Sequence, residues 1–554
     1  MTLLYLLLTL TFAKTPNACN QHNPMSPDVP VCPTTGSTLL SENFPIMAAT
    51  VSDLQGGPQY VKAYVTKVLK AQGDKPPQFF LHVTSETFDQ VVTEIKKQAP
   101  NSKVAERWLA SLSVVKTESR WNWQQDYFES FFDPNSGKPV LREVEGYERH
   151  GDAFYDMIAQ TQKDCSINEG PLLKNDEYKS GHSGGNIEAV NGLCLIGSDH
   201  FTGNEWDDYA KTTCKNTDIA VQTPSSFLKV GHTDEFFKTL KDPSQKAPCD
   251  FSLAFASPQK GLDLLRKNPA GRAFDFSNIP AEEIPARMSE GSYAEICSRH
   301  LELKKRENPS PNTPPNEKSR RGISRLLLNW ILRQANASAE DAEARRLDKT
   351  FDDYNDMEGR GPLSKEDEQR TREEKAARKN RVRRLMLQSG FLKPPRSNED
   401  TKECYNMTNR DLLKVLEADP EIKEFNAAVE ASIQKFKTDL LTKLKTKYPQ
   451  CSPKTIDMPD LFTGMMDGTQ TPATYVMASG DSIFPNPTNG EIVGNTYLIP
   501  EPVNPAFKKD IDTSINGLGL KTDYVDTHFA HVAMGNLHCS SHAMRYCRPQ
   551  GGKK

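Results

Sequence analysis

The feature that most constrains the fold is a repeated change from short apolar runs to amphipathic segments. Gln78–Val83 is a compact apolar run, and Thr84 then opens a segment whose apolar residues share one helical face. Phe251–Ala256 is a second such run, and Ser257 and Pro258 open the segment that follows it. Runs of this kind are typical of buried strands, and the segments after them of packed helices. The pattern predicts an α/β or α+β fold.

Two later segments extend this pattern. Between Phe425 and Tyr448 the apolar residues recur at steps of three and four, which predicts one long amphipathic helix. Thr496–Ile499 has the composition of a further strand. The chain has 554 residues, 36% of them hydrophobic, which allows about three to four domains of ordinary size with packed cores.

The amino terminus has the pattern of an export signal. Residues 3–12 form an apolar run followed by a polar stretch. This run is shorter than the ~20 residues that a transmembrane helix needs, and no later segment approaches that length. We therefore expect a signal peptide over residues 1–14, a secreted or extracytoplasmic protein, and no other membrane segment. Residues 15–60 are rich in Pro, Ser and Asn, which predicts an irregular leader.

The cysteines fit an exported protein. There are 11, and none belongs to a C-x-x-C pair, which argues against a structural zinc site of the usual spacing. An odd number in an exported chain predicts several disulfides and at least one remaining thiol. The spacing leaves the pairing open.

A charged stretch interrupts the chain between residues 305 and 400. It begins with the proline-rich linker Asn308–Pro315 and contains the basic run Lys375–Arg384. Such a run is most often a solvated helix face, so we expect a charged, Pro-containing and helical insertion. The whole chain has a net charge of -4, so we expect no nucleic acid as a partner apart from a contact through this insertion.

Four segments concentrate chemically active side chains: Trp121–Glu129, Gly184–Glu188, Val230–Phe236 and Gly535–His542. In the third, His232 and Asp234 stand two residues apart, so an extended backbone points both to one face. Histidine serves as an acid or base near neutral pH. In the second, the glycines permit a tight turn that presents carbonyl oxygens and a carboxylate. Each pattern alone also fits ordinary structure, since an exported cysteine such as Cys539 is more often half of a disulfide.

Together and in this order, the four segments resemble the catalytic domain of the protein-arginine deiminases, within the guanidino-group-modifying superfamily. The matching motifs are Trp123–Asp126, Gly185–Glu188, Val230–Phe236 and Leu537–Cys539. The resemblance implies a pentein-type α/β propeller. It also implies a catalytic domain in two parts, residues 61–304 and residues 401–548, with 305–400 as the insertion.

The resemblance also implies a role for each catalytic side chain. Asp126 and Asp234 would grip the substrate guanidinium through charge-assisted hydrogen bonds, and Trp123 would line the slot beside its aliphatic stem. Cys539 would attack as a thiolate and form a covalent thiouronium, and it would then be the thiol left over among the cysteines. His232 would protonate the departing ammonia and activate the water that releases citrulline.

The family has calcium sites, and one of them is matched in this sequence. The resemblance assigns it the side chains of Gln125, Glu129 and Glu188 and the carbonyl oxygens of Gly184 and Ile187, which are donors that suit calcium. The resemblance therefore implies calcium at one site. The family's second site in this domain is not matched.

Three functions remain open on these residues. The first is hydrolytic deimination of accessible arginine residues in protein or peptide substrates. Because Glu145–Gly151 departs from the segment with which the family contacts the substrate backbone, a deiminase or related hydrolase acting on free arginine, agmatine or another small guanidine is the second. The third is a noncatalytic calcium-dependent binding protein on the same fold. We favour the first, because one catalytic site explains all four motifs.

Overall fold

The computed structural model describes most of the chain outside its amino terminus and its charged stretch. The described residues are 29–32, 39–42, 44–53, 57–114, 123–126, 128–133, 139–143, 167–171, 184–197, 205–214, 217–228, 230–246, 249–307, 398–466, 478–533 and 535–548. The expected signal peptide, residues 1–14, lies outside them, and so does most of the expected insertion at 305–400.

The chain divides into two compact units. The larger consists of residues 1–296 and 401–554, and the smaller of residues 297–400. Among the described residues of the smaller unit, 297–307 end a helix and 398–400 begin another.

Five sheets among the described residues share one arrangement, in which two antiparallel strands are followed by a strand parallel to the second. Four of them are built from consecutive strands: β4 (Phe128–Phe132), β5 (Pro139–Glu143), β6 (Ile167–Pro171); β7 (Ile187–Val190), β8 (Leu193–Gly197), β9 (Ala220–Thr223); β10 (Phe237–Lys241), β11 (Phe251–Ser257), β12 (Thr455–Pro459); β15 (Glu491–Val493), β16 (Thr496–Pro500), β17 (Lys521–Val525). Strands β13 (Phe462–Met466) and β14 (Ala478–Ser482) form a separate pair.

The fifth sheet joins the two ends of the unit. Strand β18 (Ser541–Arg545) pairs antiparallel with β1 (Ile46–Ser52), and β1 pairs parallel with β2 (Gln78–His82). Strand β3 (Leu112–Val114) extends this sheet beyond β2. The last described strand of the chain therefore neighbours the first one.

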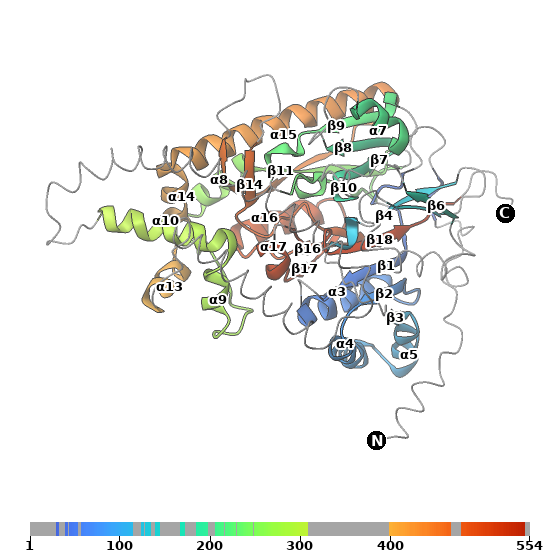
Figure 1. The fold of residues 1–554 in the computed structure, drawn as a ribbon, viewed down its shortest axis with the longest axis horizontal. Coiled ribbons are helices and arrows are strands. Elements are labelled where there is room, and N and C mark those ends of the chain that lie inside the picture. Colours follow the sequence, from blue (N-terminus) through green and yellow to red (C-terminus); the bar gives the residue numbers. More distant parts are fainter. Residues whose placement is uncertain are drawn as a thin grey trace, which may run out of the picture. The chain divides into compact units, whose positions relative to one another are not determined.

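Parallel strands need a crossover connection, and helices supply it here. The helices are α3 (Gly57–Gln72), α4 (Ser85–Gln98), α5 (Ser102–Ala110), α7 (Glu205–Cys214), α8 (Pro258–Lys267), α9 (Ile284–Met288), α10 (Gly291–Glu307), α13 (Asn398–Tyr405), α14 (Asn409–Ala418), α15 (Pro420–Lys447), α16 (Pro505–Asn516) and α17 (His528–Val532). Helix α3 links β1 to β2, α7 links β8 to β9, and α16 links β16 to β17 (Figure 1). The mixed α/β content that the sequence predicts is thus confirmed.

The helices expected after Gln78–Val83 and after Phe251–Ala256 begin where the sequence places a capping residue. Thr84 is the N-cap of α4, and its hydroxyl accepts a hydrogen bond from the Thr87 amide at 3.2 Å. Ser257 caps α8 in the same way, and Pro258 occupies the first turn, where its missing N–H costs nothing. The long amphipathic segment is one helix, α15, whose cap is Asp419.

The expected irregular leader over residues 15–60 is wrong in its carboxy-terminal part. Residues 46–52 form β1, which is buried along its whole length, and α3 begins at Gly57. Leu40 donates its amide to the Ser130 carbonyl at 2.9 Å, and Cys32 forms a disulfide with Cys547. A composition rich in Pro and Ser describes the connections, but β1 forms because partner strands lie on both of its sides, which composition does not show.

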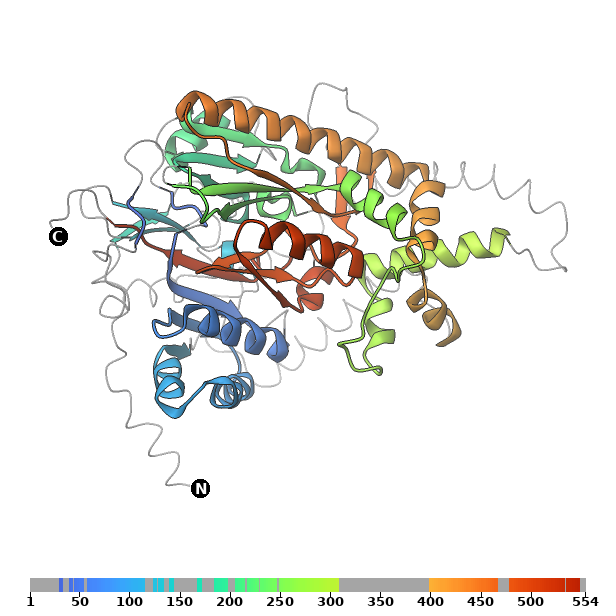
Figure 2. The same cartoon turned by 180° about the vertical axis from the view of Figure 1, so that it is seen from behind.

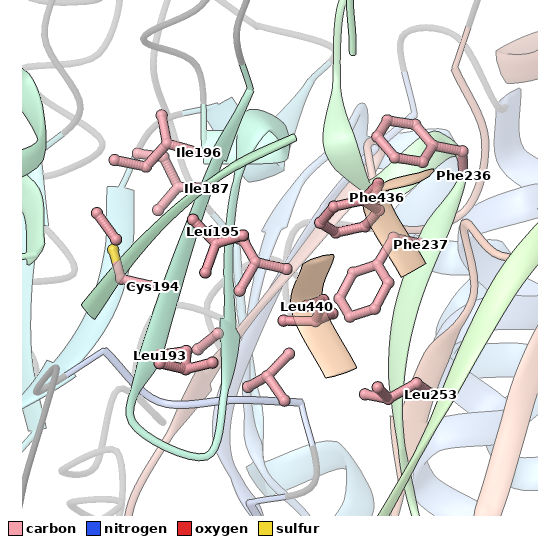
Figure 3. Close-up of a cluster of buried hydrophobic side chains, with 14 of the residues drawn as sticks. Ile187, Leu193, Cys194, Leu195, Ile196, Phe236, Phe237, Leu253, Phe436 and Leu440 are labelled. Carbon is pink, nitrogen blue, oxygen red and sulfur yellow. The ribbon is translucent and has the colours of Figure 1, made fainter. Parts of the chain in front are cut away.

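Helix α15 and strands β7 to β11 enclose one hydrophobic core. In Figures 1 and 2 the helix runs along this group of strands, and Figure 3 shows its Phe436 and Leu440 facing Phe236, Phe237 and Leu253. The ring of Phe436 meets those of Phe236 and Phe237 edge to face, with centroids 6.0 and 5.6 Å apart. Because Phe236 and Phe237 come two and three residues after Asp234, this core fixes the backbone that carries the Val230–Phe236 motif.

Two further disulfides join Cys194 to Cys214 and Cys249 to Cys451. Of the cysteines that the structure describes, all but Cys539 are disulfide-bonded. None of the described helices is both long enough and apolar enough to span a bilayer.

We expect Phe436→Ala to lower the free energy of unfolding by about 3–5 kcal/mol, because it removes a ring buried among three others. Urea unfolding followed by circular dichroism measures this. The matched control is Lys435→Ala, since the Lys435 side chain is 64% exposed and its loss should change stability by no more than about 0.5 kcal/mol. Equal losses for the two variants would show that the α15 core does not support the unit.

Candidate active site

The site forms where equivalent ends of the five sheets meet. A short segment precedes the first strand of each antiparallel pair: η1 (Gln124–Asp126) before β4, η3 (Gly184–Asn186) before β7, η6 (Thr233–Glu235) before β10, Asn486–Asn489 before β15, and Leu537–Ser540 before β18. All four sequence motifs lie in or next to these segments. The repeated arrangement of the sheets therefore collects residues that are far apart in the chain.

Cys539 lies in a turn that is held by one side chain. The Asn489 Oδ1 atom accepts hydrogen bonds from the amides of His538 at 2.9 Å and Cys539 at 3.3 Å. The Asn489 Nδ2 atom donates to Cys539 Sγ at 3.1 Å. A donor aimed at sulfur stabilises negative charge on it. The sequence analysis missed Asn489, and the cluster of turn residues before β15 was the signal that could have found it.

His232, Asp234 and Cys539 lie close together, although Asp234 belongs to the 3-10 turn η6, with His232 as its N-cap, and not to the extended backbone that the sequence analysis assumed. One side-chain nitrogen, oxygen and sulfur atom of these residues lie within 4.8 Å of one another, and all three side chains are buried. Cys539 Sγ is 3.4 Å from Asp234 Oδ2. Within the described part of the chain, Asp234 Oδ1 and His232 Nδ1 have no hydrogen-bond partner. A buried carboxylate oxygen and ring nitrogen left open beside a thiol suit a ligand that donates hydrogen bonds.

Two glycines of the motifs are required by close packing. A Cβ on Gly185 would lie 2.6 Å from His232 Nδ1, and one on Gly535 would lie 2.5 Å from the Trp123 ring. Both distances are too short for any side chain, so these glycines let the histidine and the tryptophan approach the turns. Trp123 thus lies beside the turn that carries Cys539. The backbone of Asp126 belongs to η1, and its side chain lies outside the described part of the structure.

Behind the three residues lies a chain of buried charges that the sequence analysis did not foresee. His538 Nδ1 bonds to Asp234 Oδ2 at 2.8 Å, and His538 Nε2 bonds to Glu42 Oε1 at 2.9 Å. The other Glu42 oxygen pairs with Arg545 at 2.8 Å and lies 3.7 Å from the Lys238 ammonium. Glu42 belongs to the expected leader, and no pattern in the sequence connects it with the motifs.

Opposing effects set the charge states of this network. Burial lowers the pKa of His538, but Glu42 and Asp234 outweigh it and raise the pKa to about 10, so the ring is an imidazolium. Burial raises the pKa of Asp234, but the His538 hydrogen bond and charge hold it below its ordinary value. Burial and the charge of Asp234 raise the pKa of Glu235 well above its ordinary value. Asp234 is therefore ionised, while the neighbouring Glu235 tends to hold its proton.

The residues expected to bind calcium are brought together by η1, η3, β4 and β7. A Cβ on Gly184 would lie 2.0 Å from the Gln125 carbonyl oxygen and 2.8 Å from Glu129 Oε1, so these groups are closely packed. Ile187 and Glu188 are the first residues of β7, which begins directly after η3. Burial raises the pKa of Glu129 well above its ordinary value, and the charge of Glu188 adds to the effect.

The arrangement of these residues does not fit a calcium ion. The Gln125 Oε1 atom already accepts a hydrogen bond from His542 Nδ1 at 2.5 Å, and its Nε2 atom faces Glu129 Oε1 at 2.9 Å. The Lys238 ammonium lies 3.5 Å from Glu188 Oε1. The carboxylates are suitable calcium ligands, but the amide presents a donor to one of them and a lysine already pairs with the other.

We expect Glu42→Gln to lower the free energy of unfolding by about 3–5 kcal/mol, because it leaves Arg545, Lys238 and His538 without their shared carboxylate. Glu417→Gln is the matched control, since that carboxylate is 54% exposed in a surface pair worth about 0–1 kcal/mol. Urea unfolding of both variants measures the difference. A loss for Glu42→Gln as small as that of the control would show that the buried network does not hold the leader.

The same variant has a defined pH dependence. The pKa of His538 is raised from 6.5 to about 10, so its contribution to stability is complete below 6.5 and is lost as the pH rises through 10. Removing Glu42 moves this pKa back toward 6.5, so the loss should still begin near 6.5 but should be smaller and end at lower pH than in the wild type. Unfolding measured at a series of pH values between these limits tests the shift, and parallel pH profiles would contradict it.

Comparison with known proteins gives one family and several structures. No curated protein matches the chain by sequence. Residues 379–550 match the protein-arginine deiminase family. A provisionally assigned arginine deiminase from Porphyromonas gingivalis is 10% identical, with 93% of this chain and 98% of that chain covered and a TM-score of 0.42. C. jejuni agmatine deiminase is 10% identical, with 92% and 97% covered and a TM-score of 0.40. The matched residues include the Leu537–Cys539 motif, so over residues 379–550 the chain is similar to the protein-arginine deiminase family, as that motif predicts, while the other three motifs lie outside the match.

Proposed function

We propose that this protein hydrolyses arginine residues in proteins to citrulline and releases ammonia. One observation carries the proposal: one side-chain nitrogen, oxygen and sulfur atom of His232, Asp234 and Cys539 lie within 4.8 Å of one another, and Asp234 Oδ1 and His232 Nδ1 have no hydrogen-bond partner among the described residues. A guanidinium is flat, cationic and rich in N–H donors, and a carboxylate binds it through paired hydrogen bonds. The deiminase match supports the same chemistry.

In the first half of the reaction the Cys539 thiolate attacks the guanidinium carbon. A carbon–sulfur bond forms and gives a tetrahedral adduct on the substrate. His232, as an imidazolium, donates a proton to one terminal nitrogen, and the carbon–nitrogen bond breaks with release of ammonia. The product is a thiouronium that keeps its positive charge beside Asp234.

In the second half, water attacks the thiouronium carbon while the neutral His232 takes its proton. The carbon–sulfur bond then breaks, the sulfur leaves as a thiolate, and the hydroxyl releases its remaining proton to the solvent as it becomes the urea carbonyl of citrulline. One arginine cation and one water thus yield one neutral citrulline, one ammonia and one proton, which together form ammonium. The Asn489 amide, which donates to the sulfur at 3.1 Å, supports the negative charge that Cys539 carries at both ends of the cycle.

We also infer that the five sheets belong to a pentein-type α/β propeller. Their shared strand arrangement and the pairing of β18 with β1 support this, because a closed ring needs such a joint between its ends. Export is part of the proposal, supported by disulfides such as Cys32–Cys547, Cys194–Cys214 and Cys249–Cys451, which persist in oxidising compartments.

We expect the purified protein to form citrulline in a peptide with an internal arginine, and Cys539→Ala to form none. Mass spectrometry of the peptide and an ammonia assay measure the two products. Lys241→Ala is the control, because Lys241 lies at the far end of β10 and bonds to the exposed Asn495 side chain. Turnover of free arginine or agmatine without turnover of the peptide would favour the small-guanidine alternative.

The binding-protein alternative is tested through the charged stretch. We expect turnover to persist when residues 308–397, between α10 and α13, are replaced by a short Gly-Ser linker, because all the motif residues lie outside them. The assay is the same peptide assay, with Cys539→Ala in the shortened chain as its blank. Citrulline lost in the shortened chain, although its disulfides and unfolding transition are unchanged, would contradict this expectation.

A further inference from the structure

Lys238 is a buried cation that lies beside Glu42 and Glu188, behind the residues that would contact the substrate. It lies on β10, four residues after Asp234, and its side chain is 0% exposed. Its ammonium lies 3.5 Å from Glu188 Oε1 and 3.7 Å from Glu42 Oε2. A lysine is buried in this way only where carboxylates compensate its charge. Lys238 thus bridges the cluster of expected calcium ligands and the carboxylate that supports His538.

The other expected ligands are engaged in a matching way. The oxygen of the Gln125 side chain is bonded to His542, and its NH₂ group faces Glu129. Glu129 and Glu188 therefore each face a donor from the protein itself, one neutral and one charged. A divalent ion placed between them would be repelled by the Lys238 ammonium, and the repulsion is little screened in a buried cluster.

We infer that the Lys238 ammonium is the resident counter-ion of this cluster, that it takes the place of a calcium ion, and that calcium is not required at this site. Lys238 holds Glu188 and Glu42, Glu42 bonds to His538, and His538 bonds to Asp234. The side chain that receives the guanidinium is thus fixed by a covalently attached cation, which no chelator can remove. Lys238 is a positioning residue and does not touch the substrate.

Calcium binding provides a test that does not depend on turnover. Calcium chloride is titrated into chelator-treated full-length protein by calorimetry, for wild type, Lys238→Ser, Lys238→Arg and the control Lys241→Ser. We expect the wild type to show no calcium binding at this site. We expect Lys238→Ser to gain calcium binding that a second substitution, Glu188→Gln, abolishes, and Lys238→Arg and Lys241→Ser to behave as the wild type.

The activity measurement rests on the proposed function. Citrulline formation by the wild type should change less than about twofold between excess chelator and excess calcium, whereas Lys238→Ser should lose activity in chelator and regain it with calcium. Wild-type calcium binding that Glu188→Gln abolishes would overturn the inference, even if Lys238→Ser does not fold. Absence of citrulline under every condition would defeat the proposed function instead, and the calorimetry would still decide the role of Lys238.

Discussion

The pairing of β18 with β1 is the constraint on which the site depends. Cys539 lies two residues before β18, and Glu42 lies four residues before β1, so one strand pair brings His538, the neighbour of Cys539, to a carboxylate nearly 500 positions earlier. The Cys32–Cys547 disulfide and the bond from Arg545 to Glu42 tie the same two ends together. Without this joint, His538 would have no partner opposite Asp234, and Asp234 would lose the cation that keeps it ionised.

The buried charges fix the positions of the side chains in the site, but burying them costs desolvation free energy. Removing an ion pair from water costs more than its attraction returns unless further hydrogen bonds satisfy both groups. Here Glu42, His538, Asp234 and Arg545 are each bonded to more than one group, and Lys238 compensates two carboxylates at once. Because several bonds hold each side chain of this network, each side chain is restricted to one position. The open oxygen of Asp234 and the sulfur of Cys539 are therefore fixed before any substrate arrives, which is what differential binding of a transition state needs.

Much of the fold and part of the site could be predicted from the sequence. The strands at Gln78 and Phe251, the cap at Thr84 and the single helix α15 follow from periodicity and cap residues, because these are local properties. The trio of Cys539, His232 and Asp234 followed from motif order. The repeated sheets were not foreseen, since each consists of strands of three to seven residues whose partners are set by tertiary contacts. The expected calcium ligands are brought together but are not arranged for the ion, because Lys238 and the Gln125 amide already face their carboxylates, and no local pattern in the sequence shows these contacts.

The sequence by itself determined the strands at Gln78 and Phe251, the helix α15 and its cap, and the motifs that carry His232, Asp234 and Cys539. These depend on the chemistry and spacing of neighbouring residues. Only the tertiary structure decided that a leader carboxylate supports the site, that Asn489 holds the cysteine turn, and that a lysine lies where an ion was expected. The physical reason is that the charge and hydrogen-bond partners of a buried group are set by what packs against it, and those groups come from five separate sheets.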